Sequence, residues 1–135
     1  MNNLNLKDSS ALEMFKQFLE MIEKNNAYCD WIKEQTVNSY LPELKSELLE
    51  LEQGIEASDN QNIKEEIADI LYDVFVLAKL AENEYNTDFK ELFQMAVDKI
   101  KRRKPYIFEH RSVSREEAAK YWQEAKLKEK ALKNN

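Results

Sequence analysis

The chain has 135 residues, 43% of them apolar, and a formal net charge of -6, which fits one domain with a packed core and argues against a general nucleic-acid-binding protein. Its single glycine excludes a P-loop or a dinucleotide fingerprint, both of which need several glycines. Its single histidine leaves little room for a histidine-based triad or zinc site, and its single cysteine excludes an internal disulfide. No stretch approaches the roughly 20 apolar residues of a membrane span, and the first ten residues lack the build of a signal peptide, so we expect a soluble cytoplasmic protein.

Scarce glycine and proline predict an all-α fold, and apolar residues recur at helical spacing in five segments. Ser10 and Glu13 form a capping box for the first predicted helix. Pro42 falls in the first turn of the second, where backbone N–H groups lack partners, and a turn over 58–62 follows. In chain order, the predicted helices cover about 10–25, 39–57, 61–84, 87–104 and 114–132.

The third predicted helix is the most apolar and should form the centre of the core. Its inward stripe is predicted to be Ile63, Ile67, Ile70, Val74, Leu77, Ala78 and Ala81. Pro105 should stop the fourth helix, and Ser114 with Glu117 should cap the fifth. The fifth helix carries Tyr121 and Trp122 on a thin apolar stripe, so we expect a second copy of the chain to complete the bundle.

Carboxylates flank the apolar stripes of the second and third predicted helices. Glu47 and Glu50 are three residues apart, as are Glu66 and Asp69, so each pair shares one helix face. If the two helices pack antiparallel, a rise of about 1.5 Å per residue places Glu50 near Glu66 and Glu47 near Asp69. Two like charges about 4 Å apart repel by roughly 4 kcal/mol at an effective dielectric of about 20. Protons or cations must therefore neutralise this cluster, and an all-oxygen site suits Mg²⁺.

Other interpretations of these carboxylates stay open. Each pair alone is typical of an ordinary solvated helix face. A di-iron carboxylate bundle would need Glu-x-x-His pairs, and His110 follows no such spacing. Asp73 extends the stripe of Glu66 and Asp69 by one turn. We expect it to pair with a cation, the alternatives being a further metal ligand or a water-holding group.

The densest basic run of this acidic chain covers 98–108. Lys99, Arg102 and Arg103 lie at positions i, i+3 and i+4 and therefore share one helix face. Cations near a helix C-terminus also offset the helix dipole, so a purely structural role is the alternative. Next to a carboxylate–metal cluster, lysine and arginine are suited to hold a polyphosphate and to stabilise its developing charge.

Several longer motifs occur together in this chain. In order, they are CDWIKEQT (29–36), ELLEL (47–51), KEEIADILYDVFVLAKLAE (64–82), KIKRRKPYIF (99–108) and YWQEAKLKEK (121–130). This order resembles that of the MazG family of nucleoside triphosphate pyrophosphohydrolases, from about residue 11 to residue 131. The family pattern E-x-x-E then E-x-x-D falls on Glu47, Glu50, Glu66 and Asp69. The pieces C-x-W-x-x-E-Q-T, K-x-x-R-R-x-P and W-x-x-x-K make the resemblance specific.

The resemblance implies one all-α domain over 1–135, a helical bundle completed by homodimerisation. It also implies Mg²⁺-dependent hydrolysis of (deoxy)nucleoside triphosphates to the monophosphate and pyrophosphate, with Mn²⁺ as an alternative metal. The implied role of this reaction is house-cleaning, the removal of unwanted nucleotides from the pool. Carried over residue by residue, the catalytic metal ligands would be Glu47, Glu50, Glu66 and Asp69. The phosphate contacts would be Lys99, Arg102 and Arg103, and the substrate-side loop would contribute Trp31 and Lys33.

Two departures from the family pattern affect these expectations. Ser46 occupies the position before Glu47 where the family usually has a second glutamate, and the usual C-P-W-D is C-D-W-I over 29–32. They keep open the alternative of a catalytically weak MazG-like protein that senses nucleotides or serves interactions. The expected partners are a nucleoside triphosphate and a second copy of the chain. We expect the protein to bind neither nucleic acid nor a membrane.

Overall fold

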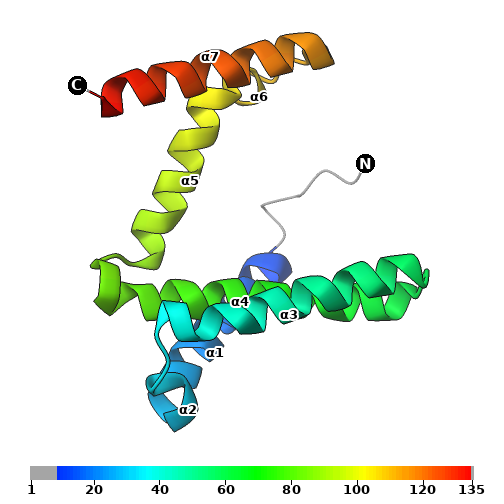
Figure 1. Ribbon diagram of the computed structural model, residues 1–135, viewed down its shortest axis with the longest axis vertical. Coiled ribbons are helices and arrows are strands. Elements are labelled where there is room, and N and C mark those ends of the chain that lie inside the picture. Colours follow the sequence, from blue (N-terminus) through cyan, green and yellow to red (C-terminus); the bar gives the residue numbers. More distant parts are fainter. Residues whose placement is uncertain (1–8, 135) are drawn as a thin grey trace. The chain divides into compact units, whose positions relative to one another are not determined.

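The computed structural model describes residues 9–134, and within them the chain is all-helical, as predicted (Figure 1). It divides into two compact units, one ending at Asp88 and one beginning at Phe89. The first unit contains α1 (Ser9–Tyr28), α2 (Asp30–Lys33), α3 (Val37–Glu56) and α4 (Asn60–Tyr85), and the second contains α5 (Phe89–Arg103), α6 (Pro105–Phe108) and α7 (Arg115–Lys133). The prediction that the N-terminus is no signal peptide concerns mainly residues 1–8, which lie outside the described part.

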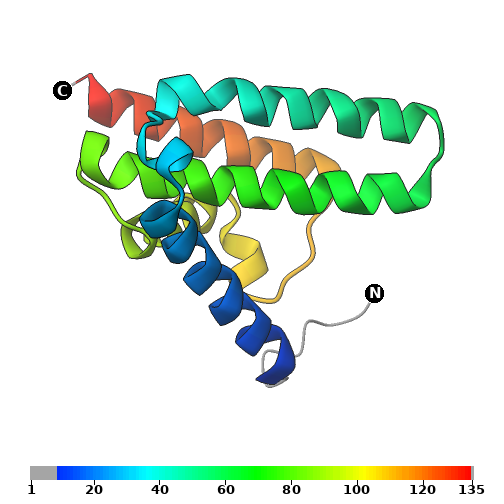
Figure 2. The same cartoon turned by 90° about the horizontal axis from the view of Figure 1, so that it is seen from below.

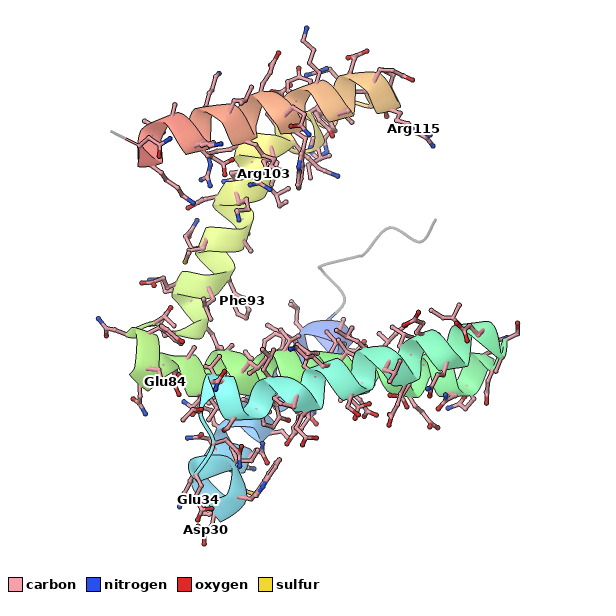
Figure 3. All side chains as sticks on the ribbon, in the orientation of Figure 1. Asp30, Glu34, Glu84, Phe93, Arg103 and Arg115 are labelled. Atoms are coloured by element: carbon pink, nitrogen blue, oxygen red, sulfur yellow. The ribbon has the colours of Figure 1, made fainter. Side chains whose placement is uncertain are left out.

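Helices α3 and α4 lie side by side and antiparallel, joined by a tight turn (Figures 1 and 2). At the turn, Asp59 caps α4 by accepting a hydrogen bond from the backbone N–H of Asn62, at 3.2 Å. Gly54 is buried there, and a Cβ atom at this position would lie 3.1 Å from Asn62 Nδ2, so glycine permits the close approach of the two helices. At the other end, the backbone N–H of Val37 donates to Glu84 at 3.1 Å (Glu84 is labelled in Figure 3).

Helix α3 begins earlier than predicted because of its N-terminal cap. Thr36 and Ser39 form a reciprocal capping box, in which the backbone N–H of each donates to the other's hydroxyl, at 2.8 and 3.0 Å. Pro42 is therefore in the second turn and not the first, where its ring removes the hydrogen bond otherwise donated to the carbonyl of Asn38. Helix α1 likewise begins at Ser9, so Ser10 is not its N-cap.

The core of the first unit lies where α1 and α3 pack on α4. Its buried side chains are Ile22, Ile32, Tyr40, Val76 and Leu80. The predicted inward stripe of α4 is wrong in part, because Ile67 and Val74 are 48% and 45% exposed while Glu66 and Asp73 are buried. Helix α4 thus turns acidic side chains towards α3 and leaves part of its apolar stripe on the surface.

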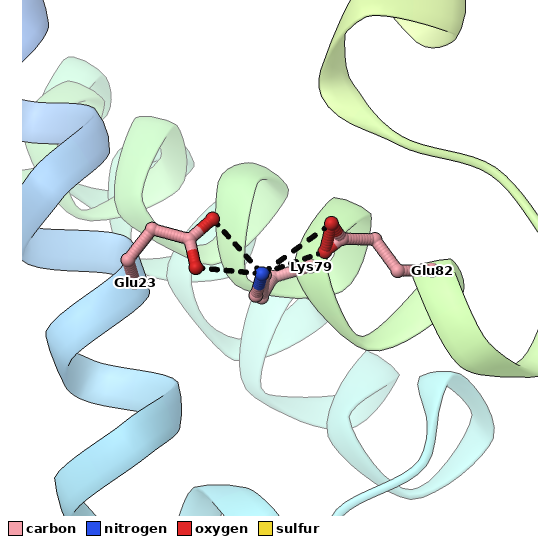
Figure 4. Close-up of polar contacts among 3 residues, drawn as sticks. All are labelled: Glu23, Lys79 and Glu82. Carbon is pink, nitrogen blue, oxygen red and sulfur yellow. Dashed lines mark hydrogen bonds and ion pairs between the residues drawn. The ribbon is translucent and has the colours of Figure 1, made fainter.

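An ion-pair triad fastens α1 to α4 (Figure 4). The ammonium group of Lys79, on α4, lies 2.7 Å from the carboxylate of Glu23 on α1 and 2.7 Å from that of Glu82. The hydrogen bonds to the two carboxylates outweigh burial and raise the pKa of Lys79. The ammonium group therefore stays charged and links the two helices.

The second unit is built on the packing of α7 against α5, with α6 between them along the chain. Pro105 ends α5 and opens α6, which confirms the predicted stop. Ser114 caps α7, as predicted, by accepting a hydrogen bond from the backbone N–H of Glu117 at 3.1 Å. Tyr106 is buried, with its ring centroid 5.2 Å from that of Tyr121. None of the helices in the described range is long and apolar enough to cross a membrane.

Candidate active site

Three carboxylates converge between α3 and α4. Glu47 on α3 and Glu66 and Asp69 on α4 each offer an oxygen within 4.8 Å of the other two. Glu66 is buried, Glu47 is half-buried and Asp69 is exposed, so the group extends from the helix–helix seam to the surface. The antiparallel packing of two helices with fixed rise brings these positions together.

The buried part of this cluster is electrostatically unsatisfied. The Oε2 atoms of Glu47 and Glu66 are buried without a hydrogen-bond partner among the described residues. A hydrogen bond with Glu66, burial, and the neighbouring Glu50 together raise the pKa of Glu47 to about 8. The neighbouring carboxyl groups and burial thus favour the protonated form of Glu47 at neutral pH, unless a cation takes the place of the proton.

The donor set of the cluster fits a hard divalent cation. All of its atoms are carboxylate oxygens, the ligands preferred by Mg²⁺ and Mn²⁺. The two orphaned oxygens are the kind of atom that a bound cation would satisfy. An ordinary solvated helix face does not account for Glu66, because a solvated carboxylate has no reason to be buried beside another one.

Glu50 lies outside the three-carboxylate group but interacts with Glu47 through hydrogen bonding and charge. Counting residues along the helices predicts Glu50 opposite Glu66 and Glu47 opposite Asp69. In the structure, Glu47 lies close to Asp69, as the count predicts, and also close to Glu66.

Asp73 lies one turn beyond Asp69 and pairs with a tyrosine, so the expected pairing with a cation is wrong. The hydroxyl of Tyr40, on α3, donates to Asp73 Oδ1 at 2.7 Å, and both residues are buried. Asp73 Oδ2 has no hydrogen-bond partner on the described part of the chain. Burial raises the pKa of Asp73 more than the hydrogen bond from Tyr40 lowers it. Tyr40 was missed by sequence analysis, since an isolated tyrosine near a helix start has no distinguishing pattern.

The segment that was expected to be the substrate-side loop contains the short helix α2, which carries Trp31 and Lys33. The indole of Trp31 is 51% exposed, and its ring centroid lies 6.1 Å from that of Tyr40. Lys33 Nζ lies 3.8 Å from the carboxylate of its neighbour Asp30 at the surface (Asp30 is labelled in Figure 3). Trp31 therefore lies beside Tyr40, whereas Lys33 lies in a surface ion pair.

The three predicted basic residues gather in the second unit around one carboxylate of α7. Arg103 binds Glu129 through two hydrogen bonds, Nε to Oε2 at 3.2 Å and Nη2 to Oε1 at 3.1 Å (Arg103 is labelled in Figure 3). Arg102 Nε lies 3.9 Å from the same carboxylate. The hydrogen bonding from Arg103, together with the charges of Arg103, Arg102 and Lys99, lowers the pKa of Glu129. The three basic side chains thus share one surface. Arg103 is the more buried of the two arginines, with its side chain 16% exposed against 53% for Arg102.

A groove of about 850 Å³ runs along this surface. Its walls carry five basic and two acidic side chains, a net formal charge of +3 in a chain whose overall charge is -6. The charged residues are Lys99, Arg102, Arg103, Lys128 and Lys133 against Glu124 and Glu129. Such a concentration of positive charge suits a polyanion.

Trp122, to which the sequence assigned no role in the site, stacks against two basic side chains next to the groove. The guanidinium carbon of Arg103 lies 4.6 Å from the centre of its ring, and Lys104 Nζ lies 5.9 Å from it. The only signal for Trp122 in the sequence is the motif W-x-x-x-K, whose role no spacing argument reveals. Glu129 lies within the motif YWQEAKLKEK, but nothing in its spacing singles it out, because its contact with Arg103 depends on the packing of α7 against α5.

Comparisons with known proteins agree with this arrangement. Residues 35–108, more than half of the chain, match the MazG nucleotide pyrophosphohydrolase domain. The chain is 31% identical over 106 residues to a nucleoside triphosphate pyrophosphohydrolase of Escherichia coli, which covers 78% of this chain and 40% of that protein. It is 27% identical over 124 residues to the nucleoside triphosphate pyrophosphohydrolase/pyrophosphatase MazG of Thermotoga maritima, covering 90% and 48%. The chain therefore spans less than half the length of these relatives.

A solved structure is similar over most of the fold. The crystal structure of a MazG-related protein from Thermotoga maritima superposes with a TM-score of 0.77 at 36% sequence identity, covering 82% of this chain and 97% of that one. The domain match includes the acidic residues of α3 and α4 and the basic residues at the end of α5. The chain belongs to the MazG nucleotide pyrophosphohydrolase family.

Proposed function

We propose that this chain hydrolyses nucleoside or deoxynucleoside triphosphates to the monophosphate and pyrophosphate, with Mg²⁺ or, as an alternative, Mn²⁺, and that it clears unwanted nucleotides from the pool. The observation that carries the proposal is the cluster of Glu47, Glu66 and Asp69, with its two buried and unpartnered oxygens. These three residues and Glu50 would hold the cation. When bound, the cation supplies charge neutralisation for the polyphosphate and increases the acidity of a coordinated water.

The remaining side chains have roles that follow from their charge and position. Lys99, Arg102 and Arg103 would bind the phosphates from their shared surface on the second unit. A carboxylate not engaged by the cation would accept a proton from the attacking water. Trp31, with its half-exposed ring, would contact the nucleoside, and Lys33 would contribute charge once released from Asp30.

A second copy of the chain is part of this proposal. Helix α4 leaves Ile67, Leu71 and Val74 about half exposed along one stripe, and stripes of this kind mark interaction surfaces. Burial of the stripe against a second chain would complete the helical packing around the acidic cluster. The cytoplasmic location and the lack of a nucleic-acid partner stay predictions.

Release of pyrophosphate from a panel of nucleotides tests the proposal. The panel contains the eight common ribo- and deoxyribonucleoside triphosphates, each with Mg²⁺, with Mn²⁺ and with a chelator. We expect metal-dependent release of pyrophosphate and monophosphate in equal amounts from at least one nucleotide. Release of orthophosphate instead would mean attack at a different phosphorus.

The alternative is a catalytically weak relative that senses nucleotides. Ser46, exposed on α3 next to Glu47, keeps this alternative open because the family usually has a glutamate there. It predicts nucleotide binding without metal-dependent turnover. Substitution Ser46→Glu should then increase the rate, whereas in a competent enzyme the same change should leave the rate within a few-fold of the parent.

A further inference from the structure

The guanidinium group of Arg103 is fixed on two sides by residues of α7. The carboxylate of Glu129 accepts hydrogen bonds from Nε and Nη2, and the ring of Trp122 covers one face at 4.6 Å. Both contacts are partly buried: the side chain of Arg103 is 16% exposed and that of Glu129 is 18% exposed. A two-point carboxylate contact and a stacked ring together define both the plane and the rotation of the group.

This arrangement leaves a defined set of donors for a ligand. A guanidinium group has five N–H donors, and Glu129 uses one on Nε and one on Nη2. Within residues 9–134, Arg103 shows no hydrogen bond from its other three donors, two of which are on Nη1. Because Arg103 lines the positively charged groove with Lys99, Arg102 and Lys128, these donors are available to an anion in the groove. A phosphate group accepts paired N–H donors of this geometry.

We propose that Glu129 is a positioning residue: with Trp122 it holds Arg103 so that its free N–H edge meets a phosphate group of the bound polyphosphate. This inference rests on the proposed function for the identity of the substrate, whereas the positive charge of the groove is observed independently of that function. The opposite role would be that of a competitor, in which Glu129 occupies Arg103 and must be displaced by phosphate. The two roles predict opposite signs when Glu129 is removed.

Four single variants, one of them Arg103→Ala, and one double variant separate these roles. Glu129→Gln removes the charge and keeps the size, and Glu129→Asp keeps the charge and withdraws it by one methylene. Glu124→Gln is the matched control, because Glu124 lines the same groove and the same charge is removed. The double variant combines Glu129→Gln with Arg103→Ala. The probe is inorganic tripolyphosphate, whose binding is measured by calorimetry without metal, and the kinetic constants for a triphosphate with Mg²⁺ are measured in parallel.

A positioning role predicts that both Glu129 variants bind tripolyphosphate more weakly by about three- to tenfold, the cost of ordering one arginine side chain on binding. KM should rise by a similar factor with kcat little changed, as for a contact made equally in the ground and transition states. Glu124→Gln should bind as tightly as the parent or more tightly. In the Arg103→Ala background, Glu129→Gln should have no further effect, since its action passes through Arg103.

Unchanged or tighter binding of tripolyphosphate by Glu129→Gln would overturn the inference. Glu129→Gln weakening binding as much in the Arg103→Ala background as in the parent would also overturn it. So would a parent protein that does not bind tripolyphosphate. The outcomes also separate this inference from the proposed function. Coupling between Glu129 and Arg103 in tripolyphosphate binding, without hydrolysis of any nucleotide, would contradict the proposed function alone. Hydrolysis without that coupling would contradict the inference alone.

Discussion

Glu47 is the residue at which protons and cations compete. Its pKa rises from an ordinary 4.5 to about 8 through a hydrogen bond with Glu66 and through burial. Between these two pH values the metal-free folded protein holds a proton that the unfolded chain releases. The free energy of unfolding should therefore fall as pH rises from about 4.5 to about 8.

Chemical denaturation with a chelator, from pH 5 to pH 9, measures this dependence. Glu47→Gln should show a smaller loss of stability with rising pH than the parent, because the amide does not ionise. Glu52→Gln, which alters an exposed carboxylate on the same helix, should keep the parent's dependence. Parallel curves for parent and Glu47→Gln would show that Glu47 titrates normally.

The Tyr40–Asp73 pair makes a second prediction about single residues. Tyr40→Phe leaves a buried carboxyl group without its hydroxyl donor, and a buried polar group without a partner costs about 1–3 kcal/mol. Urea denaturation should show a loss of that size. Tyr28→Phe removes a hydroxyl from a tyrosine that is almost fully exposed and should change stability little. Equal stability of Tyr40→Phe and the parent would mean that the hydroxyl does not support Asp73.

The sequence predicts the meeting of Glu47, Glu66 and Asp69 because helices have a fixed rise, so spacing along the chain converts into height along the seam. It does not predict that Glu66 is buried, nor that Asp73 finds a tyrosine. Those outcomes depend on which face of α4 turns towards α3, and the apolar pattern of α4 does not determine that face. Ile67 and Val74, for example, belong to the apolar stripe and yet are half exposed.

Among the elements, α1 depends on its ion-pair triad with α4. Lys79→Met removes the cation and leaves Glu23 and Glu82 facing each other, with Glu82 and Lys79 partly buried. We expect a loss of about 1 kcal/mol, the upper end for ion pairs near a surface, and a smaller loss at high salt. A double-mutant cycle with Glu23→Gln measures the coupling across the two helices, with Lys24→Gln as an exposed control on α1. A coupling energy near zero would mean that apolar contacts alone hold α1.

The five long helices could be predicted from apolar periodicity, and the two helices of four residues could not, because four residues span little more than one turn of the pattern. Helix starts were set by capping in a way that only partly shows in the sequence. Ser114 was recognisable as an N-cap, whereas Thr36 with Ser39 form a box that lacks the expected glutamate. That cap moves the start of α3 to Val37 and places Pro42 in the second turn of the helix instead of the first.

At the scale of the whole molecule, we predict a homodimer at micromolar concentration. The half-exposed stripe of Ile67, Leu71 and Val74 on α4 favours burial against another surface. Multi-angle light scattering should give twice the chain mass of 16.0 kDa. Leu71→Lys should shift the protein towards the monomer, and Lys64→Gln, an exposed change on the same helix, should not. A parent mass near 16.0 kDa would contradict the dimer.

The chain divides into two compact units. That these units form one domain over 1–135 stays a prediction.

The central claim is that the acidic seam of α3 and α4 holds a divalent cation, and the shift in melting temperature on adding millimolar Mg²⁺ tests it most directly. Binding to the folded state alone adds RT ln(1 + [L]/Kd), about 2.7 kcal/mol at a hundredfold excess over Kd. The parent should therefore melt higher with Mg²⁺, and Glu52→Gln should show the same shift. Asp69→Asn keeps the size of the side chain and removes one charged oxygen ligand, so it should lose most of the shift. A parent without a Mg²⁺ shift, or an Asp69→Asn variant that keeps the full shift, would contradict the account.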